Sequence, residues 1–211
     1  DPRNARVVLV EGGERVLPAY PPALSERARL QLERLGVTVW LSRQVTGIDG
    51  EGMQMDTERL SAKTVVWAAG VAASPLGASL GVPMDRAGRP VVLEDLSIPG
   101  YPEIQVIGDL AALPWHLPQV PGTAPAAKQM GRHAAGNVLW SMKNRKTRPF
   151  RYKDVGMLAT IGMNSAVAVI GRLQLSGYPA WLLWLVAHIY FLIGFRNRLM
   201  VLIEWAWAYW T

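Results

Sequence analysis

The chain has 211 residues, half of them hydrophobic, and carries 22 Lys and Arg against 16 Asp and Glu, a formal net charge of +6. This length can bury a substantial core in one large or two small domains. Because the chain has no Cys, it can contribute no disulfide, Cys-ligated zinc, iron–sulfur cluster or thiol nucleophile. Its three His residues, His116, His133 and His188, lack the spacing of a zinc motif, so we expect no metal site.

The N-terminal part of the sequence predicts a β-α-β unit. The β-branched run Arg6–Val10 is typical of a buried strand. Leu and Ala recur at helical spacing over Pro21–Leu35, which predicts a helix with Ser25 as its N-cap and Gly36 as its end. Val37–Leu41 predicts the next strand, and a strand, a helix and a strand in this order predict a parallel sheet.

The remaining elements follow from apolar runs and the glycines between them. Short segments over 44–61 predict a small β-meander, and two further buried strands are expected at Lys63–Ala69 and Glu103–Ile107. Thr123–Asn144 has the periodicity of a helix. Three runs predict an antiparallel sheet: Met157–Ile161, Ala166–Ile170 and Leu173–Leu175. Two helices that separate near Gly194 complete the chain.

The composition changes with position. Residues 110–153 hold eight Lys or Arg and no acidic residue, whereas residues 178–195 contain no Lys, Arg, Asp or Glu. We therefore expect a domain boundary near Phe150. Because the chain begins with Asp rather than Met and ends in an apolar, aromatic stretch without a stop signal, we also expect a fragment of a longer protein.

The apolar tail suggests membrane contact. The stretch 178–195 is at the short edge of the length that spans a bilayer, about 17–25 residues, so an interfacial helix is favoured over a spanning one. Aromatic rings prefer the headgroup level, and the tail offers Trp181, Trp184, Tyr190, Trp205, Trp207, Tyr209 and Trp210. Arg196 and Arg198 would meet lipid phosphates, and each charge of the basic run Lys143–Lys153 would add about 1 kcal/mol of attraction to anionic lipids. The alternatives are a solvated face for the basic run and a dimer core for the tail.

Two motifs in the first part of the chain suggest a nucleotide site. Glu11 directly follows the first strand, where an acid can bind ribose hydroxyls and repel an added 2′-phosphate. An ordinary solvated loop residue is the alternative. The small residues around Gly70, in Trp67–Val71, would let a backbone approach a flat cofactor, although a plain turn explains them equally well.

Two motifs in the second part suggest a further site. Gly108 and Asp109 follow a strand, where the carboxylate can accept hydrogen bonds from a sugar-alcohol hydroxyl and the glycine leaves room for a ligand. An Asx-turn is the alternative. Thr123 is a good N-cap and Pro125 suits a first helical turn, so the helix start can stabilise negative charge on a ligand, or be only a capped helix.

Taken in order, these motifs resemble the type II NADH:quinone dehydrogenases, of the FAD-dependent pyridine nucleotide oxidoreductase superfamily. The most specific piece is Gly194–Trp210 (GFRNRLMVLIEWAWAYW). The resemblance implies an α/β fold: part of a flavoprotein with two dinucleotide-binding domains, a Rossmann-like parallel sheet with a β-meander, and a C-terminal membrane-associated helical tail. It assigns 1–100 to the second half of the NADH domain with the return to the FAD domain, 101–150 to the FAD domain, and 151–211 to a small β segment and anchoring or dimerisation helices.

The resemblance also implies roles for individual residues. Gly108 and Asp109 would bind FAD, with Ala126, Ala127 and Lys128 at the helix start facing the flavin ring. Glu11 and Gly70 would lie near NADH. Ala124, Ala127 and Gln129 match the quinone-site signature AQxAxQ, in which Gln129 and Lys128 would serve the reaction. This chain has Pro125 where that signature has its first Gln.

The implied protein is a respiratory-chain enzyme that passes electrons from NADH through FAD to a quinone without pumping protons. It would be peripheral, on the cytoplasmic face of the inner (plasma) membrane, with a homodimer as one option and no nucleic-acid partner. The isolated chain should be inactive. A sulfide:quinone-type oxidoreductase and a non-catalytic membrane-anchored module are the alternatives, and the absence of Cys disfavours the former.

Overall fold

The computed structural model describes residues 5–192 and 194–210, and the side chain of Tyr209 lies outside the described residues. The strands are β1 (Val7–Val10), β2 (Val37–Trp40), β3 (Val45–Asp49), β4 (Gly52–Met55), β5 (Glu58–Ser61), β6 (Ser97–Ile98), β7 (Tyr101–Gln105), β8 (Met157–Gly162), β9 (Ser165–Ile170) and β10 (Leu173–Gly177). The helices are α1 (Pro22–Arg34), α2 (Ala124–Ser141), α3 (Tyr178–Phe191) and α4 (Phe195–Trp210), with short 3₁₀ turns η2 (Pro75–Leu80) and η3 (Gly108–Leu110).

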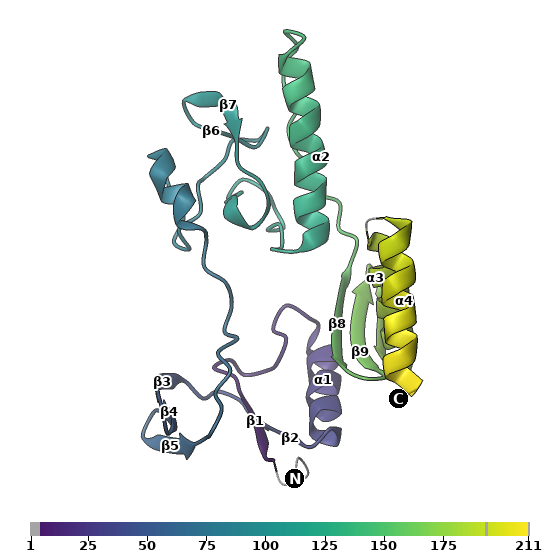
Figure 1. Cartoon of the computed structure of the whole chain (residues 1–211). Coiled ribbons are helices and arrows are strands. Elements are labelled where there is room, and N and C mark those ends of the chain that lie inside the picture. The colour runs from purple at the N-terminus through teal and green to yellow at the C-terminus, as the bar shows by residue number, and fades with distance from the viewer. Residues whose placement is uncertain (1–4, 193, 211) are drawn as a thin grey trace. The chain divides into compact units, whose positions relative to one another are not determined.

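The chain folds into two compact units, coloured along the sequence in Figure 1. The first unit runs to Trp67 and resumes at Gly156, and the second comprises Ala68–Val155. The first unit is therefore interrupted by the second in sequence. These compact units do not coincide with the three functional ranges expected from the sequence, which stay a prediction.

The predicted β-α-β unit opens the first unit. β1 and β2 pair in parallel, from Val7 opposite Val37 to Val10 opposite Trp40, with α1 between them in sequence. β3, β4 and β5 form the predicted antiparallel meander. The expected burial of the first strand is wrong: Val7 is 55% and Leu9 is 37% exposed. The reason is that, among the described strands, β1 and β2 form a sheet of only two, whose faces are incompletely covered.

α1 has a different N-terminus from the one expected. Pro21 occupies the cap position with Pro22 in the first turn, because the fixed φ of proline suits a helix start. Ser25 lies inside the helix, where its hydroxyl donates to the Leu17 carbonyl at 3.1 Å, so its prediction as N-cap is wrong. Gly36 adopts a φ of +85° after the last turn, as a helix-ending glycine does.

A three-layer arrangement forms the rest of the first unit. The antiparallel sheet β10–β9–β8 lies between α1 and α3 (Figure 1). Alternate residues of β9 serve the two faces: Val167 and Val169 pack with α1, whereas Ala166 and Ala168 pack against Ala180 of α3. The small alanine side chains let α3 lie close to the sheet.

The second unit is built around one apolar core to which α2 contributes Ala126 and Met130. β6 and β7 pair antiparallel beside it. The strand expected at Glu103–Ile107 is present but lies two residues earlier, as β7. The strand expected at Lys63–Ala69 is wrong: this stretch has no strand partner in the described chain, and Val66 is 82% exposed. An apolar run alone does not make a strand where no neighbouring strand accepts its hydrogen bonds.

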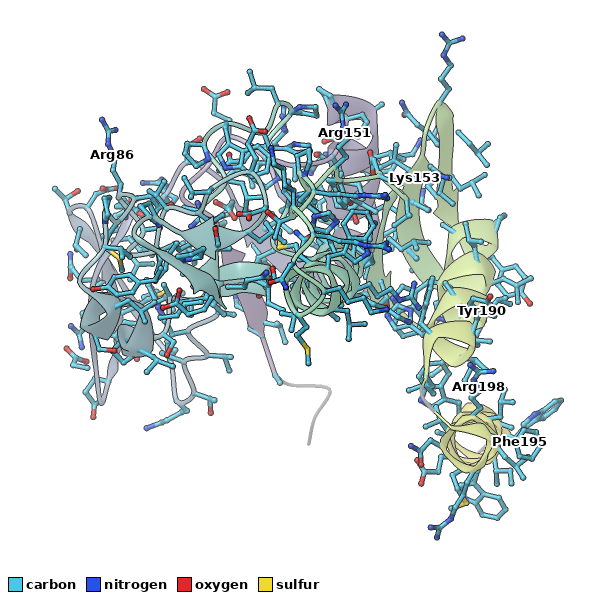
Figure 2. All side chains as sticks on the ribbon, turned by 90° about the horizontal axis from the view of Figure 1, so that it is seen from above. Arg86, Arg151, Lys153, Tyr190, Phe195 and Arg198 are labelled. Atoms are coloured by element: carbon cyan, nitrogen blue, oxygen red, sulfur yellow. The ribbon has the colours of Figure 1, made fainter. Side chains whose placement is uncertain are left out.

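The tail forms the two predicted helices, joined by contacts between side chains. Trp184 of α3 stacks on Trp205 of α4 with ring centres 5.4 Å apart, and the His188 ring lies 4.0 Å from Trp184 on α3. Arg198 donates from Nε to the Leu192 carbonyl at 2.9 Å, and Figure 2 shows Arg198 between α4 and the end of α3. Within residues 5–192 and 194–210, no helix combines the length and the apolar character needed to cross a bilayer.

Candidate functional site

A tight turn places Gly108 and Asp109 beside the start of α2. Gly108 has a φ of +68°, a conformation that favours glycine, and opens the single turn η3. Its N–H donates to the Met130 sulfur at 3.1 Å, which fixes the turn on the buried face of α2. A Cβ at position 108 would lie 3.4 Å from the Cβ of Ala127. The structure therefore brings together Gly108 and Ala127, two residues that the sequence assigned to one site.

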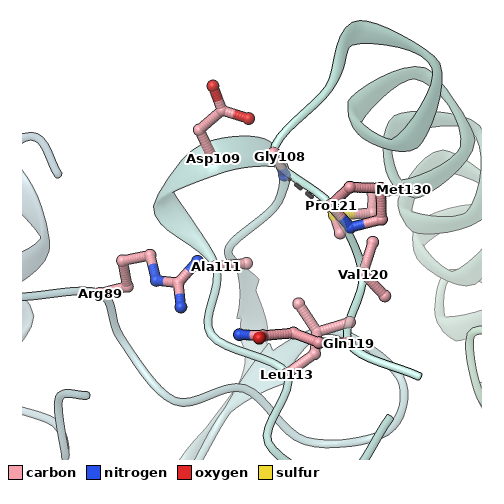
Figure 3. Close-up of a pocket in the computed structure, with 10 residues that line it drawn as sticks. Arg89, Gly108, Asp109, Ala111, Leu113, Gln119, Val120, Pro121 and Met130 are labelled. Atoms are coloured by element: carbon pink, nitrogen blue, oxygen red, sulfur yellow. Dashed lines mark hydrogen bonds between the residues drawn. The ribbon is translucent and has the colours of Figure 1, made fainter. Parts of the chain in front are cut away.

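A small pocket opens at this turn (Figure 3). Its volume is about 20 Å³, and its polar lining comes from Asp109, Arg89 and Gln119. Asp109 is exposed, and a Cβ on the neighbouring Gly122 would lie 3.6 Å from its Oδ1. The two glycines leave the carboxylate open to a ligand that approaches along the backbone.

α2 starts where the sequence predicted, but its N-terminus is not capped by the Thr123 side chain as expected. Thr123 is the N-cap residue and Pro125 lies in the first turn, yet the Thr123 side chain makes no capping hydrogen bond. The Tyr152 hydroxyl has a raised pKa: burial, and then the Asp154 carboxylate, raise it, and interactions with the Val155 backbone and the Thr123 side chain only partly oppose them. The first backbone N–H groups of α2 thus lack the side-chain acceptor expected for them.

The side chains of the first turns of α2 differ in exposure. Ala126 is buried in the core of the unit, Ala127 is half-buried, and Ala124 and Lys128 are exposed. Gln129 turns to the segment that follows the helix: its Nε2 donates to the Lys153 carbonyl at 2.9 Å, and its Oε1 accepts from the Lys153 N–H at 2.9 Å. Both halves of this amide therefore bond to one backbone residue.

The Gln129 contact is the first of a series along α2. His133 bonds to the Arg148 carbonyl at 2.8 Å, and buried Asn137 both donates to that carbonyl and accepts from the Arg148 N–H. Residues four apart lie on one face of a helix, so the three side chains form a line that holds the return segment 148–153. We call this line the α2 ladder.

Neither Glu11 nor Gly70 lines this pocket, and Glu11 belongs to the other unit. Glu11 directly follows β1 in the first unit, and its Oε1 accepts from the Gly13 N–H at 2.7 Å. Its backbone pairs with Trp40 and Arg43, which fixes the loop at the carboxyl ends of β1 and β2. Gly70 belongs to the second unit, is exposed, and has a φ of +117°.

Sequence reasoning missed several residues of the pocket, above all Arg89. The pattern Asp85–Gly88 before it is that of an Asx-turn, which was the available signal. No group of three His, Asp or Glu residues suited to a metal ion occurs within the part of the chain that the structure describes.

A family model described as pyridine nucleotide-disulphide oxidoreductase matches residues 3–131, and the chain belongs to this family. Among curated relatives, the type II NADH:quinone oxidoreductase Ndh of Mycobacterium tuberculosis is 41% identical over 97% of this chain and 46% of its own length. The type II NADH:quinone oxidoreductase of Staphylococcus saprophyticus is 32% identical over 84% of this chain and 45% of its own length. The chain thus spans about half the length of these relatives.

Solved structures share the fold. NDH2 from Plasmodium falciparum in complex with NADH has a TM-score of 0.86 at 18% identity, over 97% of this chain and 58% of that one. The sulfide:quinone oxidoreductase of Aquifex aeolicus has a TM-score of 0.69 at 17% identity, over 91% of this chain and 50% of that one. The α/β fold with parallel and antiparallel sheets is that of this family.

Proposed function

We propose that the protein is a type II NADH:quinone oxidoreductase, which passes electrons from NADH through FAD to a membrane quinone without pumping protons. The observation that carries this proposal is the 41% identity to an enzyme of that name over 97% of the chain. Because the chain spans about half of such relatives, the activity is proposed for the full-length gene product. The isolated chain is expected to be inactive.

The turn at Gly108 fits a flavin nucleotide. A side chain there would fill the space between the turn and Ala127, and the open carboxylate of Asp109 can accept hydrogen bonds from ribitol hydroxyls. The uncapped start of α2, with Ala126, Ala127 and Lys128, would stabilise electron density on the flavin ring. Bound FAD would supply the redox chemistry that links hydride from NADH to electron transfer to the quinone, and these residues would hold and orient it.

NADH would be held in part by Glu11 of the first unit. The Glu11 carboxylate, held in place by the Gly13 N–H, would accept hydrogen bonds from the ribose hydroxyls and repel a 2′-phosphate. A Cβ added to exposed Gly70 would meet no atom within 4 Å beyond its two chain neighbours, so a flat ring could approach the backbone there.

The quinone would contact Ala124, Ala127 and Lys128 on the outer face of the first turns of α2. Gln129 would act mainly as a positioning residue, because its amide is bonded to the backbone of Lys153. Lys128 is exposed beside it and offers a cation to the reduced quinone oxygen.

We further propose that the tail docks the enzyme on the cytoplasmic face of the inner (plasma) membrane as a peripheral protein. Exposed apolar side chains recur every four residues along each helix, and therefore lie on one face of each: Tyr178, Leu182, Val186 and Tyr190 on α3, and Phe195, Leu199, Ile203 and Trp207 on α4. Arg196 and the basic run Lys143–Lys153 would add attraction to anionic lipids. A homodimer contact is the competing use of the same stripes.

The electron-transfer proposal is tested with the purified full-length gene product. We expect a flavin absorption spectrum that NADH bleaches and a quinone restores, with little activity when sulfide replaces NADH. The proposal would be overturned if the purified protein contained no flavin. It would also be overturned if sulfide reduced the bound flavin and NADH did not. The second outcome would favour the sulfide:quinone alternative. That enzyme shares the fold, but its chemistry uses Cys, and this chain has none.

The docking proposal is tested by sedimentation with phosphatidylcholine–phosphatidylglycerol vesicles. The double variant Phe195→Ser, Ile203→Ser should lose binding, while Leu76→Ser, an exposed apolar residue of the second unit, should bind as wild type. High salt should not release the wild type, since apolar burial is not screened as charge is. Release by salt alone would contradict the proposal, and an altered mass in solution with unaltered vesicle binding would indicate the dimer instead.

A further inference from the structure

Arg89 is the one basic side chain that lines the pocket at Gly108 within the described residues. Figure 3 shows its guanidinium pointing into the pocket from a segment separate from the Gly108–Asp109 turn. The guanidinium is paired with Asp85 rather than with Asp109. The pocket therefore presents a cation and a separate carboxylate that do not neutralise each other.

The pair with Asp85 fixes the position of Arg89. Asp85 Oδ2 accepts from Arg89 Nε at 2.7 Å and lies 2.6 Å from Nη2, while its Oδ1 accepts the backbone N–H groups of Arg89 and Ala87. Burial would raise the pKa of Asp85, but these hydrogen bonds lower it on balance. The anchor is therefore ionised and ordered at neutral pH.

One nitrogen of the guanidinium remains for a ligand. Nε and Nη2 bond to Asp85, and Nη1 has no polar partner within the part of the chain that the structure describes. The side chain is 27% exposed, so its charge is only partly solvated. A pre-positioned, partly desolvated guanidinium is well suited to a phosphate oxygen.

We infer that Arg89 binds the phosphate of the flavin nucleotide that is attached to the ribitol held by Asp109. The chemistry of the pocket carries this step: a carboxylate accepts from hydroxyls, a guanidinium donates to a phosphate, and a ribityl phosphate has both groups side by side. The inference rests on the proposed function, because it requires that this pocket binds a flavin nucleotide.

The test compares flavins with and without a phosphate. The apo form of the full-length gene product is titrated with FAD, FMN and riboflavin, and binding is followed by flavin fluorescence. Arg89→Gln should weaken FAD and FMN about 10- to 100-fold, as expected for loss of a hydrogen bond between charged groups, and riboflavin less than about twofold. Arg86→Gln is the matched control, because Arg86 lies in the same turn and points away from the unit (Figure 2).

Arg89→Lys provides a second variant that keeps the cation, and it should bind FMN with intermediate affinity. The inference is overturned if Arg89→Gln binds FAD as wild type does, or if it weakens riboflavin as much as FMN, which would indicate a role in the Asp85 turn alone. Failure of the proposed function has a different signature: the wild type itself would bind no flavin, or its bound flavin would not accept electrons from NADH.

Discussion

The two hydrogen bonds between Gln129 and the backbone of Lys153 give a sharp prediction for the α2 ladder. Gln129→Ala removes both bonds and leaves the Lys153 N–H and carbonyl to water. A net hydrogen bond contributes about 0.5–1.5 kcal/mol, and both bonds are exposed, so we expect the free energy of unfolding to fall by about 1–2 kcal/mol. Gln129→Glu, which keeps an acceptor for the Lys153 N–H but loses the donor, should lose about half as much.

Urea unfolding of the full-length gene product measures this loss, and steady-state kinetics measures its effect on the quinone. Arg132→Ala is the control, because Arg132 is exposed on the same helix and makes no ladder contact. If Gln129 positions the site, the KM for quinone should rise together with the loss of stability, while reduction of a soluble acceptor by NADH persists. A Gln129→Ala protein as stable as wild type within about 0.3 kcal/mol would refute the reasoning, and a raised KM at unchanged stability would show a direct contact with quinone instead.

Further predictions concern three acidic side chains. Glu11→Gln should lower the ratio of kcat/KM for NADH to kcat/KM for NADPH by about tenfold, because the 2′-phosphate of NADPH is no longer repelled. A wild-type enzyme that uses NADH and NADPH equally well would contradict the assignment of Glu11. Asp109→Ala should weaken FAD binding by about 1.5–3 kcal/mol, measured as flavin retained on dilution, and unchanged retention would count against the ribitol contact. Burial tends to raise the pKa of Asp95, but hydrogen bonds from Ser97 and Thr147 hold it below 3.8. Ionised Asp95 therefore stabilises the fold fully above pH 3.8, and progressively less as the pH falls through the pKa of Asp95 in the folded protein. The loss of unfolding free energy caused by Asp95→Asn, measured by urea unfolding, should therefore shrink at acid pH. A loss that stays constant with pH would contradict the link between Asp95 ionisation and stability.

The periodicity of apolar residues and the positions of glycine and proline were sufficient to predict most of the secondary structure. The β-α-β unit, the meander, α2, the three-stranded sheet and the two tail helices all form where these patterns place them. The errors have local physical causes. Ser25 was expected to cap α1, but two consecutive prolines already fix the helix start. The run at Lys63–Ala69 has strand-like composition, yet pairing depends on a neighbouring strand that composition cannot reveal.

Proposed site residues could be grouped from the sequence only where a motif links them, and their functional roles stay a prediction. Gly108, Asp109 and the start of α2 are joined by a strand–turn–helix pattern, and the structure places Gly108 beside Ala127 of that helix. The bond between Gln129 and Lys153 depends on how the chain returns after the helix, which no periodicity encodes. Arg89 reaches the pocket from a separate turn, so only the tertiary fold places it beside Asp109.

The interruption of the first unit by the second affects the order in which the protein can fold during synthesis. The second unit is continuous, so every segment of its core is available once Val155 has been made. α1 is made much earlier than β9, yet Leu24 and Ala28 are buried in a cluster completed by Val167. Contacts between distant segments form slowly because the long intervening loop must first close. On the ribosome, the apolar face of α1 therefore waits uncovered while the second unit folds, which makes that face the natural early target for chaperones.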